Sequence, residues 1–270
     1  MAEGGTLRVG LFGIGLAVVA ILALVWPEYF AGLVVLITVL AAYEWHRMVA
    51  AGRDYRLETA ITSLTVAAAV LILLILRQIG PALLLVAIGT LVSVIAARSR
   101  GQSPVWQGLG VVYLGLPAIA LVSLRTFPER GWQIIAGLFL IVWATDTGAL
   151  IFGKLIGGPR MAPVLSPSKT WAGTIGGSVT AALIFGCYIW LLGGTLWIAA
   201  LFGLIFSAVA HAGDLFESFA KRRFGVKNSG SLIPGHGGVL DRMDSTIFAS
   251  VALALLIFLA KFNLLFGIAS

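Results

Sequence analysis

Apolar runs of about 20 residues recur along this chain and constrain its fold more than any other feature. A helix needs roughly 20 apolar residues to cross the hydrocarbon core of a bilayer, where only helices and closed barrels satisfy their backbone groups. Nine runs are long enough, and they cover residues 7–26, 30–50, 58–76, 80–97, 105–124, 131–152, 171–192, 195–215 and 243–267. The sequence therefore predicts an all-α, polytopic integral membrane protein with about nine transmembrane helices.

The composition agrees with this class. Of the 270 residues, 60% are hydrophobic and only 11% are charged, whereas soluble domains carry about 25% charged residues. The first run is too long, and too well continued by others, to be only a signal peptide. Cys187 is the only cysteine, so a disulfide framework within the chain is excluded. We expect Cys187 to be a small apolar residue of the interior.

The basic residues are distributed unequally between the two sides that nine spans would create. One side receives the N-terminus and the connections after the second, fourth, sixth and eighth runs, which hold 14 of the 18 Lys and Arg residues. The other side receives Arg77, Arg125, Arg130 and Lys261. Basic residues concentrate on the cytoplasmic side of membrane proteins. The N-terminus is therefore expected to be cytoplasmic, and omission of one early span would destroy this asymmetry.

Polar residues are also distributed unequally along the chain. Residues 1–130 are mostly apolar, with charges at the ends of the runs, whereas residues 140–245 hold nearly all the unusual polar groups. We interpret residues 1–130 as an N-terminal transmembrane scaffold and residues 131–270 as a C-terminal catalytic module with cytoplasmic loops. Glu44 and His46 are expected at the membrane interface, with a role at the edge of a pocket as the alternative.

The segment from Ser218 to Asp244 is the strongest candidate for a functional site. It holds five Lys and Arg residues, two Asp, one His and five Gly between two apolar runs. In a membrane protein such a polar cluster usually marks a working site. The glycines of Gly235-His236-Gly237-Gly238 allow backbone N–H groups to approach an oxyanion. His236 could contact phosphate or act as an acid, or it could be an ordinary turn residue.

Two pairs of carboxylates flank this segment at helical spacing. Asp214 and Glu217 lie three residues apart, as do Asp241 and Asp244, so each pair shares one helical face. Mg²⁺ prefers carboxylate oxygens and adds phosphate oxygens from a substrate. Asp214, Asp241 and Asp244 are therefore candidate metal ligands, although one Asp could simply cap a helix.

A second polar set precedes the run at 171–192. Asp146 has apolar neighbours on both sides, which favours a functional role. Ser166, Lys169 and Thr170 precede a predicted helix start, where backbone N–H groups could face an anion. Lys169 could bind phosphate as a point charge, and helix capping is the alternative for the hydroxyl groups. His211 could orient a ligand or be a buried, hydrogen-bonded residue.

These motifs together resemble one family. The pattern S-x-x-K-R…K-x-S-G…P-G-H-G-G-x-x-D-R-x-D from Ser218 to Asp244 is similar to the signature of the phosphatidate cytidylyltransferases. The earlier motifs D-T-G-A, S-P-S-K-T-W and G-D-L-F-E-S resemble that family as well, so the likeness is close over about residues 140–248. Asn228 stands where the family commonly has Asp, and Ala172 where Glu or Gln is usual.

The resemblance implies a reaction in which CTP and phosphatidic acid give CDP-diacylglycerol and pyrophosphate with Mg²⁺, with a second, monovalent cation left open. It implies a homodimer in the inner membrane, with the active site facing the cytoplasm. The implied catalytic residues are Asp214, Asp241, Lys221, Arg222, His236 and Arg242. The implied substrate-binding residues are Asp146, Ser166, Lys169, Thr170, Ser218, Lys227, Gly235, Gly237 and Gly238. Asp214, Asp241 and Asp244 would bind the metal.

Two other functions fit parts of the sequence. A CTP-dependent kinase of a polyprenol-type lipid alcohol would share the nucleotide site but release CDP. A secondary transporter would use Asp146 and Asp214 as ion ligands and would need polar groups along a path through both leaflets. The polar groups concentrate on one side, which disfavours transport.

Overall fold

The computed structural model describes residues 26–232 and 237–259, which form eight helices and one short hairpin. The helices are α2 (Pro27–Ala50), α3 (Arg56–Leu76), α4 (Ile79–Ser99), α5 (Pro104–Arg125), α6 (Gly131–Leu155), α7 (Trp171–Leu191), α8 (Leu196–Arg223) and α9 (Leu240–Leu259). The strands are β1 (Arg160–Ala162) and β2 (Ser166–Thr170). The run predicted at 7–26 lies outside the described residues.

Among these residues, the seven helices α2 to α8 are long and apolar enough to cross a membrane. The all-α polytopic membrane class is therefore confirmed, whereas the total of nine spans stays a prediction. Pro27 and Pro104 stand in the first turns of α2 and α5, where a missing N–H costs nothing. The eighth described helix, α9, begins with three charged residues in its first five, Asp241, Arg242 and Asp244.

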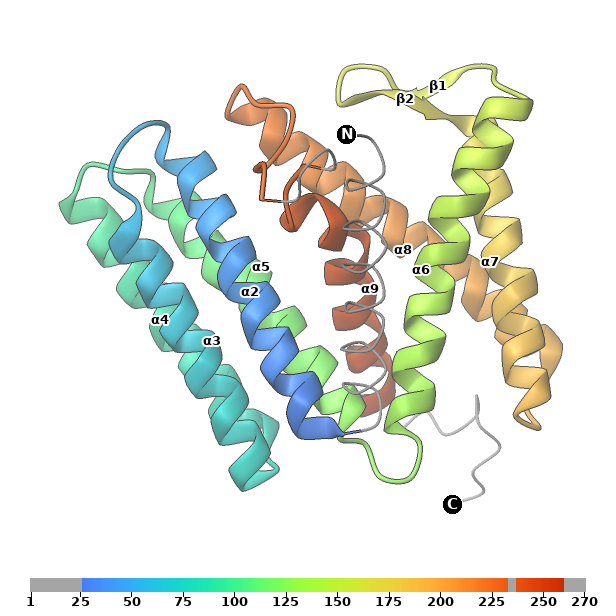
Figure 1. Ribbon diagram of the computed structural model, residues 1–270, viewed down its shortest axis with the longest axis horizontal. Coiled ribbons are helices and arrows are strands. Elements are labelled where there is room, and N and C mark those ends of the chain that lie inside the picture. The colour runs from blue at the N-terminus through green and yellow to red at the C-terminus, as the bar shows by residue number, and fades with distance from the viewer. Residues whose placement is uncertain (1–25, 233–236, 260–270) are drawn as a thin grey trace, which may run out of the picture.

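The connections alternate between two ends of the helix bundle (Figure 1). The connections after α2, α4, α6 and α8 lie at one end, and those after α3, α5 and α7 lie at the other. The first set contains the basic connections that the charge distribution assigned to one side. The described helices therefore agree with the predicted alternation, and the orientation of the bundle in the membrane stays a prediction.

Helix α8 is longer than the run predicted at 195–215. Its 28 residues extend about 42 Å at 1.5 Å per residue, whereas the hydrocarbon core is about 30 Å thick. The helix therefore continues past the apolar run and carries Glu217, Lys221 and Arg222 on regular helical backbone. It ends before Gly225, whose φ of 70° is a conformation that glycine adopts without strain.

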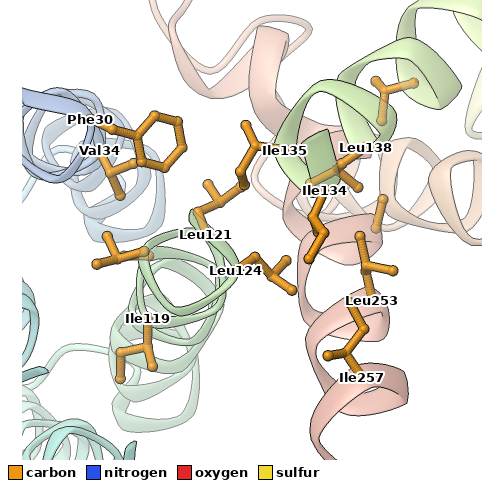
Figure 2. Close-up of a cluster of buried hydrophobic side chains, with 14 of the residues drawn as sticks. Phe30, Val34, Ile119, Leu121, Leu124, Ile134, Ile135, Leu138, Leu253 and Ile257 are labelled. Carbon is orange, nitrogen blue, oxygen red and sulfur yellow. The ribbon is translucent and has the colours of Figure 1, made fainter. Parts of the chain in front are cut away.

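Helix α9 lies between two groups of helices (Figure 1). Helices α2 to α5 pack on one another, and α7 packs against both α6 and α8, while α9 contacts both α5 and α8. Figure 2 shows the apolar core where α2, α5, α6 and α9 meet. Its buried side chains include Phe30, Leu121, Leu124, Ile135 and Leu253. This core fixes α9, and the charged start of α9 then lies at the end of the bundle that carries the basic connections.

The hairpin was not predicted from the sequence. Strands β1 and β2 pair antiparallel, with Arg160 opposite Thr170 and Ala162 opposite Ser166. Thr170 then caps α7, because its hydroxyl oxygen accepts the N–H of Gly173 at 3.1 Å. The hairpin therefore places Ser166, Lys169 and Thr170 at the entrance of α7, beside the end of α6 (Figure 1).

Candidate active site

A polar cavity of about 420 Å³ lies among α6, α7, α8 and the hairpin. Its charged and imidazole side chains come from α6, α8 and both strands of the hairpin, and they are Asp146, Lys154, Arg160, Lys169, His211 and Asp214. The structure thus brings Asp146 and Lys169, which the sequence placed in one polar set, together with Asp214 from the other set. Such a convergence of opposite charges in a hollow is typical of a binding site for a charged ligand.

Lys169 and Asp214 form an ion pair across this cavity. The other carboxylate oxygen of Asp214 accepts a weak hydrogen bond from the hydroxyl of Ser218 at 3.4 Å. Both charged side chains keep partial exposure, 18% for Lys169 and 28% for Asp214. The ammonium nitrogen of Lys169 is itself buried beside Asp214, so an anion in the cavity would have to compete with Asp214 for Lys169.

The serine and threonine residues before α7 divide into two kinds. Ser166 and Ser168 lie on β2, and their hydroxyl oxygens are 3.5 Å apart on the exposed hairpin. Thr170 is buried, and its hydroxyl oxygen is occupied by the cap of α7. The capping alternative therefore describes Thr170. Ser168 lines the cavity, whereas Ser166 is not among its lining residues.

A second polar cluster is built around Lys221 on α8. The ammonium group of Lys221 lies 2.7 Å from one carboxylate oxygen of Asp241 and 3.1 Å from one of Glu217. Lys221 is 12% exposed and Glu217 is fully buried. The other carboxylate oxygen of Asp241 accepts the backbone N–H groups of Ser229 and Gly238, at 3.0 and 2.9 Å. Asp241 thus connects α8 with residues 229–230 and 237–239, which are the two described arms of the glycine-rich loop.

Asp244 lies one turn further along α9. One of its carboxylate oxygens accepts the N–H of Ser245 at 2.7 Å. The negative charges of Asp244, Asp214 and Asp146 lie close enough to repel one another. A cation beside any two of them would lower this repulsion.

The remaining predicted residues surround these two clusters. Arg222 is exposed and donates to the carbonyl oxygen of Leu165 at 3.3 Å, which holds the hairpin against α8. Lys227 and Arg242 are exposed, as is Asn228. Gly237 has a φ of 86°, and a Cβ there would lie 3.0 Å from Asp241. Gly235 and His236 lie outside the described residues.

The depth of Glu44 and His46 in the membrane stays a prediction, because burial within the protein does not fix it. Both side chains are fully buried in the protein. His46 is hydrogen-bonded to Gln107 and, at 2.7 Å, to Thr62. Glu44 reaches the glycine-rich loop from α2, a contact between residues more than 180 positions apart that no local motif could indicate. Cys187, expected in the interior, is exposed on α7.

Comparison with known proteins adds independent information. Residues 6–260 match the cytidylyltransferase family. A phosphatidate cytidylyltransferase of Brucella melitensis is 44% identical over 153 residues, which are 56% of each protein. A phosphatidate cytidylyltransferase of Staphylococcus aureus is 40% identical over 158 residues, 55% of this chain and 57% of the relative. The chain thus spans a little over half the length of the curated relatives it matches.

Proposed function

This chain belongs to the cytidylyltransferase family, and from that premise we propose that it transfers the cytidylyl group of CTP to phosphatidic acid. The products are CDP-diacylglycerol and pyrophosphate, as the names of its relatives support. The observation that carries the proposal is the polar cavity in which Lys169, Asp214 and Asp146 converge. It joins basic groups for phosphates with carboxylates for a cation, at the end of a membrane helix bundle.

The reaction requires little covalent participation by the protein. A phosphate oxygen of phosphatidic acid attacks the α-phosphorus of CTP and forms a new phosphorus–oxygen bond. The bond from the α-phosphorus to the bridging oxygen breaks, and pyrophosphate leaves with that electron pair. Catalysis then depends on orienting the two phosphates and on stabilising the developing negative charge.

Basic residues of the cavity supply that stabilisation. Lys154, Arg160 and Lys169 line it, and Arg222 lies against the hairpin beside it. Lys169 already pairs with the carboxylate of Asp214. A triphosphate would therefore bind Lys169 together with Asp214 or displace Asp214 from it. Lys221 differs, because it is held by Glu217 and Asp241. We assign Lys169 to the nucleotide phosphates and Lys221 to the ordering of the site, with Arg242 near the lipid phosphate.

The residues of the site fit a magnesium ion when the substrate completes the ligand set. Within residues 26–232 and 237–259, no three His, Cys, Asp or Glu side chains converge as metal ligands. Mg²⁺ usually binds one or two carboxylates together with substrate phosphates, and Asp214 with Asp244 offers such a pair. Bound there, Mg²⁺ would neutralise charge on the triphosphate. Asp241 is the less available third ligand, since its oxygens already accept Lys221 and two N–H groups.

An apolar pocket offers a place for the acyl chains of the lipid. It has a volume of about 180 Å³ and lies among α2, α5, α6 and α9. Trp143 and Met243 line it, and in sequence they are close neighbours of Asp146 and Asp244. A lipid in this pocket would therefore have its phosphate near the carboxylates.

The setting of the enzyme is part of the proposal. The excess of basic residues at one end of the bundle supports an active site on the cytoplasmic side of the inner membrane, where CTP is available. The family resemblance also supports a homodimer, and the mass of the purified protein in detergent would test it. We also propose that residues 1–130 form a scaffold and residues 131–270 a catalytic module. Glu44 of the scaffold contacts the loop of the catalytic module.

The experiment is incubation of the purified protein with Mg²⁺, phosphatidic acid and CTP labelled at the α-phosphate. A labelled lipid supports the proposal, and an unlabelled lipid fraction contradicts it. Asp214→Asn should abolish labelling because it removes a cavity carboxylate. Asp54→Asn is a matched control, since Asp54 is also ion-paired, 2.9 Å from Arg100, but lies outside the cavity. If Asp214→Asn labels the lipid as fast as Asp54→Asn does, Asp214 has no role in the site.

A further inference from the structure

Glu44 on α2 is a buried carboxylate whose hydrogen-bond partners are in the glycine-rich loop. Its oxygens accept the backbone N–H of Leu240 at 2.8 Å, the N–H of Val239 at 3.1 Å and the hydroxyl of Ser229 at 3.2 Å. The side chain is fully buried. Burial of a carboxylate is costly unless hydrogen bonds compensate it, so these three donors are what makes the position tolerable.

The charge of Glu44 is compensated by backbone rather than by a basic side chain. Among the ion pairs of the described residues, none includes Glu44. Val239 and Leu240 stand at the start of α9, where free N–H groups and the helix dipole favour a negative charge. Glu44 on α2 therefore caps the N-terminus of α9, although the two helices are far apart in the sequence.

Two glycines of the loop leave the space that Glu44 occupies. A Cβ at Gly230 would lie 2.2 Å from one carboxylate oxygen of Glu44, and a Cβ at Gly238 would lie 2.4 Å from the other. Real Cβ atoms do not approach an oxygen this closely. The Ser-Gly and Gly-Gly pairs of the loop therefore fit around this carboxylate, which packs between the two arms of the loop.

Asp241 connects the same two arms from the other side. It accepts the N–H groups of Ser229 and Gly238 on one oxygen and contacts Lys221 with the other. Ser229 thus gives its N–H to Asp241 and its hydroxyl to Glu44. A change at Glu44 is consequently transmitted through Ser229 and the start of α9 to the carboxylate of Asp241.

We propose that Glu44 is a positioning residue for the cytidylyl transfer proposed above, on which this inference rests. It fixes residues 229–230 and 238–241 from α2 and so sets the orientation of Asp241 and Lys221 at the site. Glu44 does not touch the cavity among α6, α7 and α8, so its effect is indirect. The N-terminal helices then contribute to catalysis as well as to the membrane scaffold.

The test uses the full-length protein with Glu44→Gln and a matched control, Glu58→Gln. Glu58 is also fully buried, but it pairs with Arg100 at 3.1 Å and makes no contact with the loop among the described hydrogen bonds. Glutamine keeps the size of Glu44 and replaces one acceptor oxygen by an NH₂ group that faces N–H donors. Hydrogen exchange of the peptide covering residues 237–243 reports the loop directly, without any need for catalysis.

In Glu44→Gln, exchange of this peptide should accelerate about tenfold or more, because hydrogen bonds to a charged acceptor are lost. The kcat should fall about 100-fold, the effect expected from a misplacement of about 1 Å. The KM for CTP should change less than about threefold, because the nucleotide contacts remain. Glu58→Gln should leave exchange in the peptide unchanged. Ser229→Ala, which removes only one contact to Glu44, should shift exchange and kcat in the same direction by less.

Two results would overturn the inference. Exchange at the wild-type rate in Glu44→Gln would show that Glu44 does not hold the loop, whatever the activity. Equal acceleration in Glu58→Gln would show a general effect of losing a buried carboxylate. If Glu44→Gln cannot be purified folded, unchanged exchange and kcat in Ser229→Ala would overturn it. Wild-type protein that transfers no cytidylyl group would overturn the proposed function, a result separate from the exchange measurement.

Discussion

Replacement of Lys221 by methionine tests the cluster that orders the glycine-rich loop. Methionine keeps most of the length of the lysine side chain but removes the cation between Glu217 and Asp241. Glu217 is fully buried and Asp241 is 13% exposed. The two side-chain oxygens of Glu217 have no hydrogen-bond partner among the described residues, so the ion pair with Lys221 is the principal compensation of its charge.

The magnitude follows from that burial. Removal of one partner of a buried ion pair costs about 3–5 kcal/mol, because an uncompensated charge is left inside. For a chain of this size, 1 kcal/mol lowers the melting temperature by roughly 2–4 °C. The apparent melting temperature of Lys221→Met in detergent should therefore fall by about 10 °C. Cytidylyl transfer should be lost as well, because Asp241 loses its partner on α8.

The double variant Lys221→Met/Glu217→Gln separates the two effects. Glu217→Gln removes the buried charge that Lys221→Met leaves without a partner, so part of the lost melting temperature should return. Activity should not return, because Asp241 still lacks a cation. The reasoning is refuted if the single variant melts within about 1 °C of the wild type, or if the double variant is no more stable than the single one.

Three further predictions concern the loop, the cavity and the metal. Gly238→Ala places a Cβ 2.3 Å from the hydroxyl oxygen of Ser229, so it should lower the free energy of unfolding by about 1–3 kcal/mol and lower kcat. Gly80→Ala is the control, because nothing lies within 4 Å of a Cβ there. Equal melting temperatures and rates for the two variants would contradict the contact. Asp146→Asn should raise the KM for CTP or lower kcat by about tenfold or more, because it removes a carboxylate from the cavity; steady-state kinetics identical to wild type would make Asp146 structural. Chelation of divalent cations should stop transfer and added Mg²⁺ should restore it, whereas transfer that continues in excess chelator would contradict a metal-assisted reaction.

The positions of the helices could be predicted because the bilayer imposes one length scale on apolar runs. Most predicted runs begin and end within a few residues of the described helices, for example 80–97 against Ile79–Ser99 and 171–192 against Trp171–Leu191. The end of α8 could not be predicted from hydropathy, since its last two turns are mostly polar and lie beyond the apolar run. The hairpin was missed because strands of three and five residues carry too few positions to show alternation.

Part of the site could be predicted because polar residues are costly in a membrane. This argument identified Asp146 and Asp214, and the position of Lys169 before a predicted helix start identified the third residue. The structure places all three around one cavity. It could not reveal which charges neutralise one another. The pairs Lys169–Asp214 and Lys221–Asp241 join residues 45 and 20 positions apart, and Glu44 meets its partners only after α2 and α9 have packed. Such contacts depend on the fold and leave no local pattern in the sequence.

The fate of the phosphates of CTP tests the central proposal most directly. Wild-type protein would be incubated with Mg²⁺, phosphatidic acid and two preparations of CTP, labelled at the α- or the γ-phosphate. The proposal predicts that the α-label enters the lipid while an equal amount of γ-label is released as pyrophosphate. Appearance of the γ-label in a lipid, with release of CDP, would contradict nucleotidyl transfer and identify a CTP-dependent lipid kinase instead.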